Sequence, residues 1–210
     1  MPASSGFQPL SVVAEDLACA RGGRLVFAGL SFRLAPGTLT AIIGPNGAGK
    51  SSLLRMIAGL LQPHAGTLVM ERLDGSDAAA AHYLGHVDAL KPAETLIQTL
   101  RFWAALTGGG RGEDELAGAA DAVGLRHVLH LPVQVLSAGQ RRRAGLARLL
   151  IAPRRLWLLD EPTSALDRAG VDLLGALMRS HLAQGGVIAA ATHGDLPTRP
   201  DATLDLAALE

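Results

Sequence analysis

The chain has 210 residues, 49% of them hydrophobic and 18% charged, enough to bury the core of one domain or of one domain with an inserted subdomain. Its 19 basic and 19 acidic residues cancel, so no basic excess indicates a nucleic-acid partner. No apolar run approaches the roughly 18 residues that span a bilayer, and residues 1–6 lack a signal-peptide pattern. The single cysteine, Cys19, cannot form an intrachain disulfide, which favours a reducing compartment.

The N-terminal part of the chain is predicted to form strands. Short strand-like runs lie at residues 12–13, 25–27, 30–34 and 39–43. The last run is apolar and ends at a glycine loop, which is typical of a buried parallel strand.

A helix is predicted after this loop, followed by two more strands at 66–71 and 82–84. The helix is indicated by apolar residues that fall on one helical face. These residues are Leu53, Leu54, Ile57, Ala58 and Leu61.

Residues 88–152 have a different pattern, helical and amphipathic, and we interpret them as an inserted helical subdomain. Strand character returns at 156–159 and 187–191, with a helix predicted at 167–182 between them. This alternation predicts an α/β fold with a parallel sheet, whose strand-end loops carry the ligand.

Residues 44–51 match the P-loop pattern in every fixed position, between a predicted strand and a predicted helix. Glycines let backbone N–H groups and the helix N-terminus approach phosphate. Lys50 is expected to neutralise the β- and γ-phosphates and Ser51 to bind Mg²⁺; the alternative, a glycine-rich turn with chance spacing, is disfavoured. The predicted nucleotide-binding residues here are Gly44, Pro45, Asn46, Gly47, Ala48, Gly49, Lys50, Ser51 and Ser52.

Two adjacent carboxylates end the apolar strand at 156–159. Asp160 is expected to hold Mg²⁺ through a water molecule, and Glu161 to polarise the attacking water. A solvated strand end is the alternative, and the P-loop upstream makes it less favoured.

The segment 136–140 reads Leu-Ser-Ala-Gly-Gln and precedes a predicted helix. Ser137 is a good N-cap, and its hydroxyl, the Gly139 amide and the helix dipole form an anion site. Three arginines follow, and a solvated helix face explains them better than nucleic-acid binding does. They are Arg141, Arg142 and Arg143.

With this segment between the P-loop and the acidic strand, the chain resembles the ATP-binding cassette (ABC) ATPases. The resemblance implies a single domain at residues 8–205. It has a RecA-like parallel-sheet core, an N-terminal antiparallel β subdomain and an inserted α-helical subdomain at about 88–152.

The resemblance also assigns roles to the site residues. Ser137, Gly139 and Gln140 would face the γ-phosphate bound by a second subunit, although the usual pentapeptide has glycine where this chain has Ala138. His193 resembles the histidine that contacts the γ-phosphate and orients the catalytic glutamate. The segment 164–167 resembles the loop that contacts the opposite subunit.

Two positions depart from the family pattern. Arg21 stands where an aromatic residue commonly stacks on adenine, and a guanidinium plane can also stack on a base. His86 stands where a glutamine usually reaches Mg²⁺ and couples the site to the membrane subunit.

These departures, together with residues 82–103, are similar to one branch, the ATP-binding subunits of cytochrome c biogenesis heme exporters. The branch implies ATP and Mg²⁺ as cofactors, a second copy in a head-to-tail nucleotide sandwich, and integral membrane transporter subunits as partners. It implies a peripheral position at the cytoplasmic face of the bacterial inner membrane. No direct contact with heme or nucleic acid is expected.

Other functions remain open. The chain could serve another ABC exporter, for a drug or a lipid, or belong to a soluble ABC protein acting on ribosomes or DNA. A P-loop kinase has no need of the segment 136–140, and intact Lys50, Asp160, Glu161 and His193 argue against a cassette that binds ATP without hydrolysing it. The apolar segment 90–103 is either a groove for a membrane subunit's helix or simply core.

Overall fold

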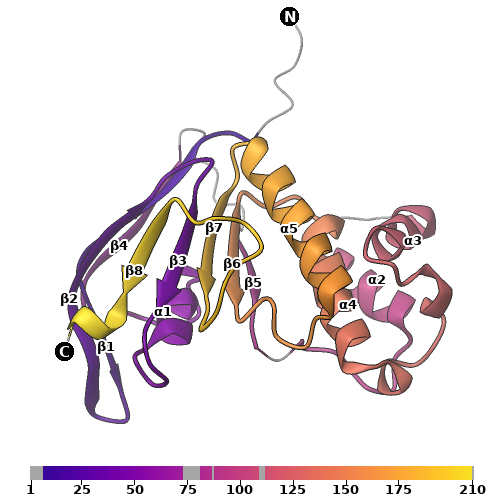
Figure 1. Cartoon of the computed structure of the whole chain (residues 1–210), viewed down its shortest axis with the longest axis horizontal. Coiled ribbons are helices and arrows are strands. Elements are labelled where there is room, and N and C mark those ends of the chain that lie inside the picture. The colour runs from indigo at the N-terminus through magenta and orange to yellow at the C-terminus, as the bar shows by residue number, and fades with distance from the viewer. Residues whose placement is uncertain (1–6, 73–80, 87, 109–111, 210) are drawn as a thin grey trace, which may run out of the picture.

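The computed structural model describes residues 7–72, 81–86, 88–108 and 112–209 (Figure 1). Residues 1–6, where no signal peptide is expected, lie outside the described residues. The predicted α/β class is confirmed: a five-stranded parallel sheet lies beside a three-stranded antiparallel sheet, with helices packed against them. Among the described residues, no helix combines the length and the apolar character needed to cross a membrane.

The antiparallel sheet has the strand order β2-β1-β4. Its strands are β1 (Leu10–Arg21), β2 (Arg24–Leu34) and β4 (Ala65–Arg72). The prediction of two separate strands at 25–27 and 30–34 is wrong, because pairing with β1 carries one strand across residues 28–29, with register shifts along the way. Tertiary pairing thus overrides the weak local strand signal.

The parallel sheet has the order β5-β6-β7-β3-β8. Its strands in this order are Ala81–Leu84, Leu156–Asp160, Val187–Ala191, Leu39–Ile43 and Ala202–Asp205. Every residue of β6 and β7 is buried, as expected for central strands covered on both faces. The edge strand β8 escaped prediction because three of its four residues are exposed, so it carries no apolar run.

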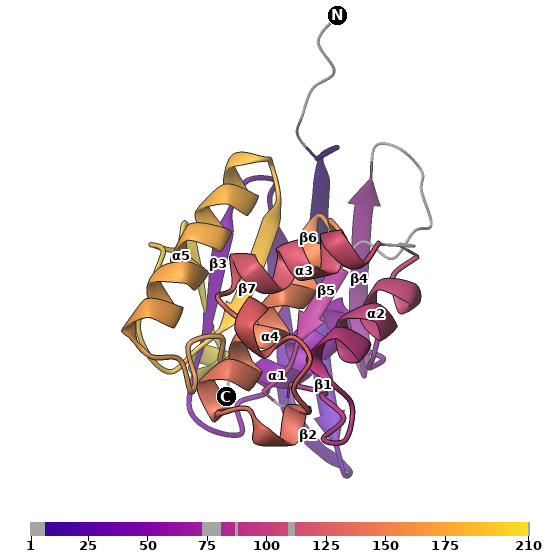
Figure 2. The ribbon, with the colours of Figure 1, turned by 90° about the vertical axis from the view of Figure 1, so that its right-hand side faces the viewer.

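Helices cover both faces of this sheet (Figure 1). Helix α1 (Lys50–Ile57) packs between the two sheets, in a core that also contains Leu34 and Leu158. The other face carries α5 (Arg168–Ala183) and α4 (Ala138–Ile151), with α2 (Leu96–Leu106) and α3 (Glu113–Ala122) beyond them (Figure 2). Short 3₁₀ turns lie at Arg126–Val128, Val133–Val135 and Leu206–Leu209.

The segment 90–103 lies mainly in the core. Leu96 and Leu100 are fully buried and Trp103 is 3% exposed, whereas Phe102 is 47% exposed. These values favour the core interpretation of the segment over a groove lined by its apolar residues.

Two histidines are buried on this side of the sheet. The His181 ring stacks on Trp157 at a centroid distance of 3.9 Å, and the His82 Nε2 atom lies 2.6 Å from the carbonyl oxygen of Ala152. Burial lowers the pKa of each histidine from 6.5 to about 4. Both rings are therefore neutral in the native protein near neutral pH.

We expect folding stability to fall as the pH drops from 6.5 toward about 4. In this window the unfolded chain binds more protons than the native chain, so stability rises with pH. The lowered pKa of His181 corresponds to a loss on the order of 3 kcal/mol at the acid end. Urea unfolding of His181→Phe, which keeps a ring on Trp157, should show a shallower acid decline, whereas the exposed His130→Gln should match wild type. Equal declines in all three proteins would contradict this explanation.

Candidate nucleotide-binding site

The candidate site lies at the carboxyl edge of the parallel sheet. The P-loop connects β3 to α1, Asp160 and Glu161 stand at the end of β6, and His193 follows β7. Because β6, β7 and β3 are neighbours, their carboxyl ends bring these residues together. They surround a cavity of about 420 Å³ lined by Arg21, Val26, Asn46, Gly47, Gly49, Lys50, Ser51, Ser52, His86, Asp160, Glu161 and His193.

The P-loop needs glycine for steric reasons. Gly49 has a φ of 98°, and a Cβ atom there would lie 2.8 Å from side-chain atoms of Phe27 and Val26. Helix α1 starts at the next residue, Lys50, so its N-terminus opens at the cavity and favours an anion there. Sequence reasoning missed Val26, since it lies on β2 with no motif of its own.

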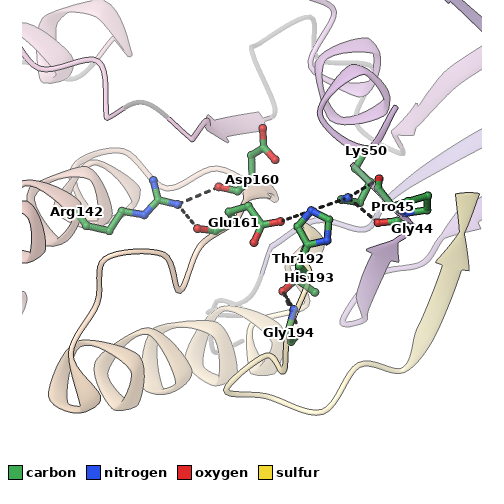
Figure 3. Close-up of polar contacts among 9 residues, drawn as sticks. All are labelled: Gly44, Pro45, Lys50, Arg142, Asp160, Glu161, Thr192, His193 and Gly194. Atoms are coloured by element: carbon green, nitrogen blue, oxygen red, sulfur yellow. Dashed lines mark hydrogen bonds and ion pairs between the residues drawn. The ribbon is translucent and has the colours of Figure 1, made fainter. Parts of the chain in front are cut away.

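The Lys50 side chain folds back onto the P-loop and binds its backbone. Its ammonium donates to the carbonyl oxygens of Gly44 (2.7 Å) and Pro45 (3.1 Å) and lies 3.0 Å from His193 Nε2 (Figure 3). Lysine has only donors, so Nε2 accepts here and the His193 ring carries its proton on Nδ1. Gly44 and Pro45 therefore act through their carbonyl groups, while the Ala48 amide donates to Pro45 within the loop.

Asp160 is 3% exposed and lies beside a tyrosine to which sequence reasoning gave no role. The Tyr83 hydroxyl donates to Asp160 Oδ2 at 3.4 Å and accepts from Arg55 Nε at 3.3 Å. Burial raises the pKa of the Tyr83 phenol, so it stays protonated and keeps donating to the carboxylate.

Glu161 has an unusual backbone conformation for a residue with a side chain, with a φ of 48°. Its Oε1 atom is buried, has no hydrogen-bond partner among the described residues, and lies 3.6 Å from His193 Nε2. That distance exceeds a hydrogen bond. A buried acceptor left open in this way suits a water molecule, which is what a general base must hold.

The next turn positions His193. The Thr192 amide donates to the carbonyl of Ile42, and the Thr192 hydroxyl both donates to the Gly194 carbonyl and accepts from the Gly194 amide (Figure 3). These bonds fix the chain on either side of His193.

The prediction of a solvated face for the three arginines after Gln140 is wrong for Arg142. Arg142 is 2% exposed, and its guanidinium donates to backbone carbonyls at the end of β6. Arg142 lies on the buried side of α4. Because three arginines follow one another in the sequence, the pattern of polar and apolar residues does not show which of them is buried.

The segment at the start of α4 lies apart from the cavity, none of whose lining residues comes from it. Ser137 is the N-cap, as predicted: its hydroxyl accepts from the Gln140 amide at 3.1 Å, and Gln140 Oε1 accepts from the Ser137 amide at 2.9 Å. Ser137 is exposed, and Gly139 and Gln140 are half-buried. A helix N-terminus therefore stands open near the surface, away from the chain's own P-loop.

Both residues that depart from the family pattern line the cavity. Arg21 is exposed at the end of β1, and His86 follows β5. His86 also borders a second cavity of about 440 Å³, whose other lining residues are Asp88, Ala89, Leu90, Pro92, Val133, Gln134 and Arg141. His86 is thus the residue shared by the two cavities.

The residues present fit a magnesium ion. Ser51 and Asp160 supply a hydroxyl and a carboxylate oxygen in one cavity, the hard oxygen ligands that Mg²⁺ prefers. Magnesium keeps most of its other ligands as phosphate oxygens and water, so two side chains suffice.

The fold and the cavity define a P-loop nucleoside triphosphatase. The model of the ABC transporter family matches residues 27–164, more than half of the chain. The chain therefore belongs to the ATP-binding cassette family, whose members bind ATP.

Curated relatives agree with this assignment. A protein of Bradyrhizobium diazoefficiens is 57% identical over 182 residues, covering 83% of this chain and 88% of the relative. A protein of Rhodospirillum rubrum is 49% identical over an alignment of 214 residues, which covers 97% of this chain and 89% of the relative. Both are named cytochrome c biogenesis ATP-binding export protein CcmA.

Solved structures share the fold. An ATP binding subunit of an ABC transporter superposes with a TM-score of 0.76 at 27% identity, covering 87% of this chain and 79% of that chain. A bacterial Atm1-family ABC exporter with ATP bound gives a TM-score of 0.74 at 24% identity, covering 92% of this chain and 36% of that one.

Replacing Lys50 by alanine should weaken ATP binding. Loss of one charge-assisted contact to phosphate is worth about 1.5–3 kcal/mol, or roughly 10- to 100-fold in Kd. Titration with a fluorescent ATP analogue measures the change. Lys91→Ala, which removes an exposed lysine paired with Glu94, should leave Kd unchanged. Equal affinities of Lys50→Ala and wild type for the ATP analogue would show that Lys50 does not contribute to nucleotide binding.

Proposed function

We propose that this chain is the ATP-hydrolysing subunit of an ABC transporter complex that serves heme export or heme release in cytochrome c biogenesis. The observation that carries the proposal is the P-loop cavity, where Lys50, Glu161 and His193 meet. The names of the relatives support the heme branch.

In the proposed reaction, water attacks the γ-phosphorus, the bond to the β,γ-bridging oxygen breaks, and ADP and inorganic phosphate leave. Glu161 accepts the proton of the water through its open Oε1. Lys50 exchanges its carbonyl and imidazole acceptors for phosphate oxygens, so His193 Nε2 no longer accepts from Lys50. Once the ring proton moves from Nδ1 to Nε2, this nitrogen can donate to the γ-phosphate or to Glu161. Magnesium held by Ser51 and Asp160 would neutralise phosphate charge.

The site of one chain needs a second copy to be complete. The N-terminus of α4, with Ser137, Gly139 and Gln140, is a built anion site that lies outside the chain's own cavity. A head-to-tail dimer would place it on the γ-phosphate bound by the other copy. Two such contacts would form at once, so ATP closes the dimer and hydrolysis reopens it.

Membrane subunits are proposed to dock at the second cavity. His86 borders both cavities, so movement of a docked segment would reach the nucleotide through this residue. The residues that line this cavity include apolar Leu90, Pro92 and Val133 and charged Asp88 and Arg141. This arrangement suits an amphipathic helix at the cytoplasmic face of the inner membrane. Heme and nucleic acid need not touch this subunit.

The Glu161→Gln variant should bind ATP but hydrolyse it at least 100-fold more slowly, since an amide is a poor base. It should then accumulate as an ATP-bound dimer, which light scattering after gel filtration detects. Adding Ser137→Arg should prevent dimerisation while ATP binding persists, because Ser137 lies outside the chain's own cavity. Wild-type turnover by Glu161→Gln would show that Glu161 is not the base.

The heme assignment is tested by purifying Glu161→Gln from detergent-solubilised membranes with ATP, and identifying bound proteins by mass spectrometry. We expect membrane subunits of cytochrome c biogenesis, and loss of mature c-type cytochromes in cells that carry only this variant. Recovery of an unrelated permease would be consistent with the ATPase mechanism but would contradict the assignment to heme export. Ribosomal or DNA-associated proteins alone would contradict the transporter assignment.

A further inference from the structure

Arg142 is an arginine buried in the interior whose donors are all engaged. Its Nε donates to Pro162 O (3.4 Å), Nη1 to Gly85 O (2.9 Å) and Asp88 Oδ1 (3.0 Å), and Nη2 to Asp160 O (2.9 Å) and Glu161 O (2.7 Å). A guanidinium has five N–H donors and keeps its charge. The Asp88 carboxylate compensates that charge. Figure 3 shows the guanidinium bonded to Asp160 and Glu161 at the end of β6.

Three consecutive carbonyls in this set, those of residues 160–162, belong to the end of β6 and the turn after it, which carry the proposed magnesium ligand and the proposed base. Glu161 sits in the left-handed region at φ 48°, which costs about 1–2 kcal/mol for a residue with a side chain. Its carbonyl accepts from Arg142 and from the Ser164 amide, and its own amide donates to Ala191 O. Such a conformation persists only where surrounding bonds fix it.

The other two acceptors flank His86. The Gly85 carbonyl precedes it, and Asp88 follows it by two residues. One side chain therefore ties the end of β6 to the loop that borders both cavities.

Arg142 also belongs to the helix whose N-terminus carries Ser137. Arg142 lies five positions after Ser137, which corresponds to roughly 7.5 Å along the axis of α4. Ser137 caps the continuous helix of 14 residues that contains Arg142, and rigid secondary elements of this kind can carry coupling between sites.

We propose that Arg142 is a positioning residue that holds Glu161 in its left-handed conformation and couples it to the N-terminus of α4. Engagement of that N-terminus by the nucleotide of a second copy then sets the position of Glu161 in the first copy's own site. This inference rests on the proposed function, and it assigns the coupling between the two ATP sites to one side chain. Lysine cannot replace it, because three donors on one nitrogen do not span acceptors on two separate segments.

The test compares Arg142→Lys and Arg142→Gln with wild type in the assembled complex with its membrane subunits. Arg168→Gln is the matched control, since the Arg168 side chain is 91% exposed and paired with Asp172 on α5. The rate is expressed per ATP-binding site, counted with a fluorescent ATP analogue, so that unfolded protein does not contribute. The readouts are kcat, KM and the Hill coefficient for ATP.

We expect kcat per site to fall roughly 10- to 100-fold in both variants, the size of effect that a displacement near 1 Å produces. KM should stay within about 3-fold of wild type, because Arg142 does not line the cavity. The Hill coefficient should fall from above 1 in wild type toward 1. Arg142→Lys keeps the charge opposite Asp88, so it gives a folded variant if Arg142→Gln does not fold.

Wild-type kcat per site in Arg142→Lys would overturn the positioning role, as would a loss that appears in KM alone. An unchanged Hill coefficient would overturn the coupling. Glu161→Gln is measured in parallel. If it is inactive while the Arg142 variants turn over normally, only this inference fails; if it turns over normally, the proposed catalytic role of Glu161 fails first.

Discussion

Burial of the parallel sheet on both faces is the constraint on which the site depends. Strands β6 and β7 are buried at every position, and they are apolar throughout except for Asp160 at the end of β6, so packing on either side holds both strands in place. Their carboxyl ends then lie next to that of β3 at one edge. The P-loop, Asp160 with Glu161, and His193 converge there because each lies at the carboxyl end of one of these strands, although the P-loop precedes Asp160 by more than a hundred residues in sequence.

Two buried cations organise the charges around this edge. The Lys50 ammonium donates to two carbonyls of its own loop and to His193, so its three N–H donors have acceptors before phosphate arrives. Arg142 binds the backbone carbonyls of Asp160 and Glu161 and does not engage their carboxylates. Glu161 Oε1 therefore remains an open acceptor inside a polar cavity. Unsatisfied buried acceptors are costly, and this one lies where a water molecule has a chemical role.

Sequence patterns predicted the elements that depend on local chemistry. The left-handed backbone of the P-loop glycines and the Ser137 cap depend on conformation and hydrogen bonding within a few residues, and the apolar run at 156–159 marks a buried strand. Tertiary pairing decided the rest. Strand β8 forms only because β3 offers it an edge, and β2 continues through Gly29 because β1 pairs along it. The burial of Arg142 depends on where α4 meets the end of β6, which the run of three arginines does not reveal.

We propose that each chain carries two half-sites, the P-loop cavity and the N-terminus of α4, and that a second copy completes both. Two variants that each add one cysteine, Asn46→Cys in the P-loop and Ala138→Cys at the start of α4, are made in Glu161→Gln and mixed with ATP and a bis-maleimide. Both positions are exposed, whereas native Cys19 is 1% exposed. The account predicts an ATP-dependent cross-link between the two variants and none within either variant alone. Cross-links of each variant to itself, or none with ATP, would contradict a head-to-tail nucleotide sandwich.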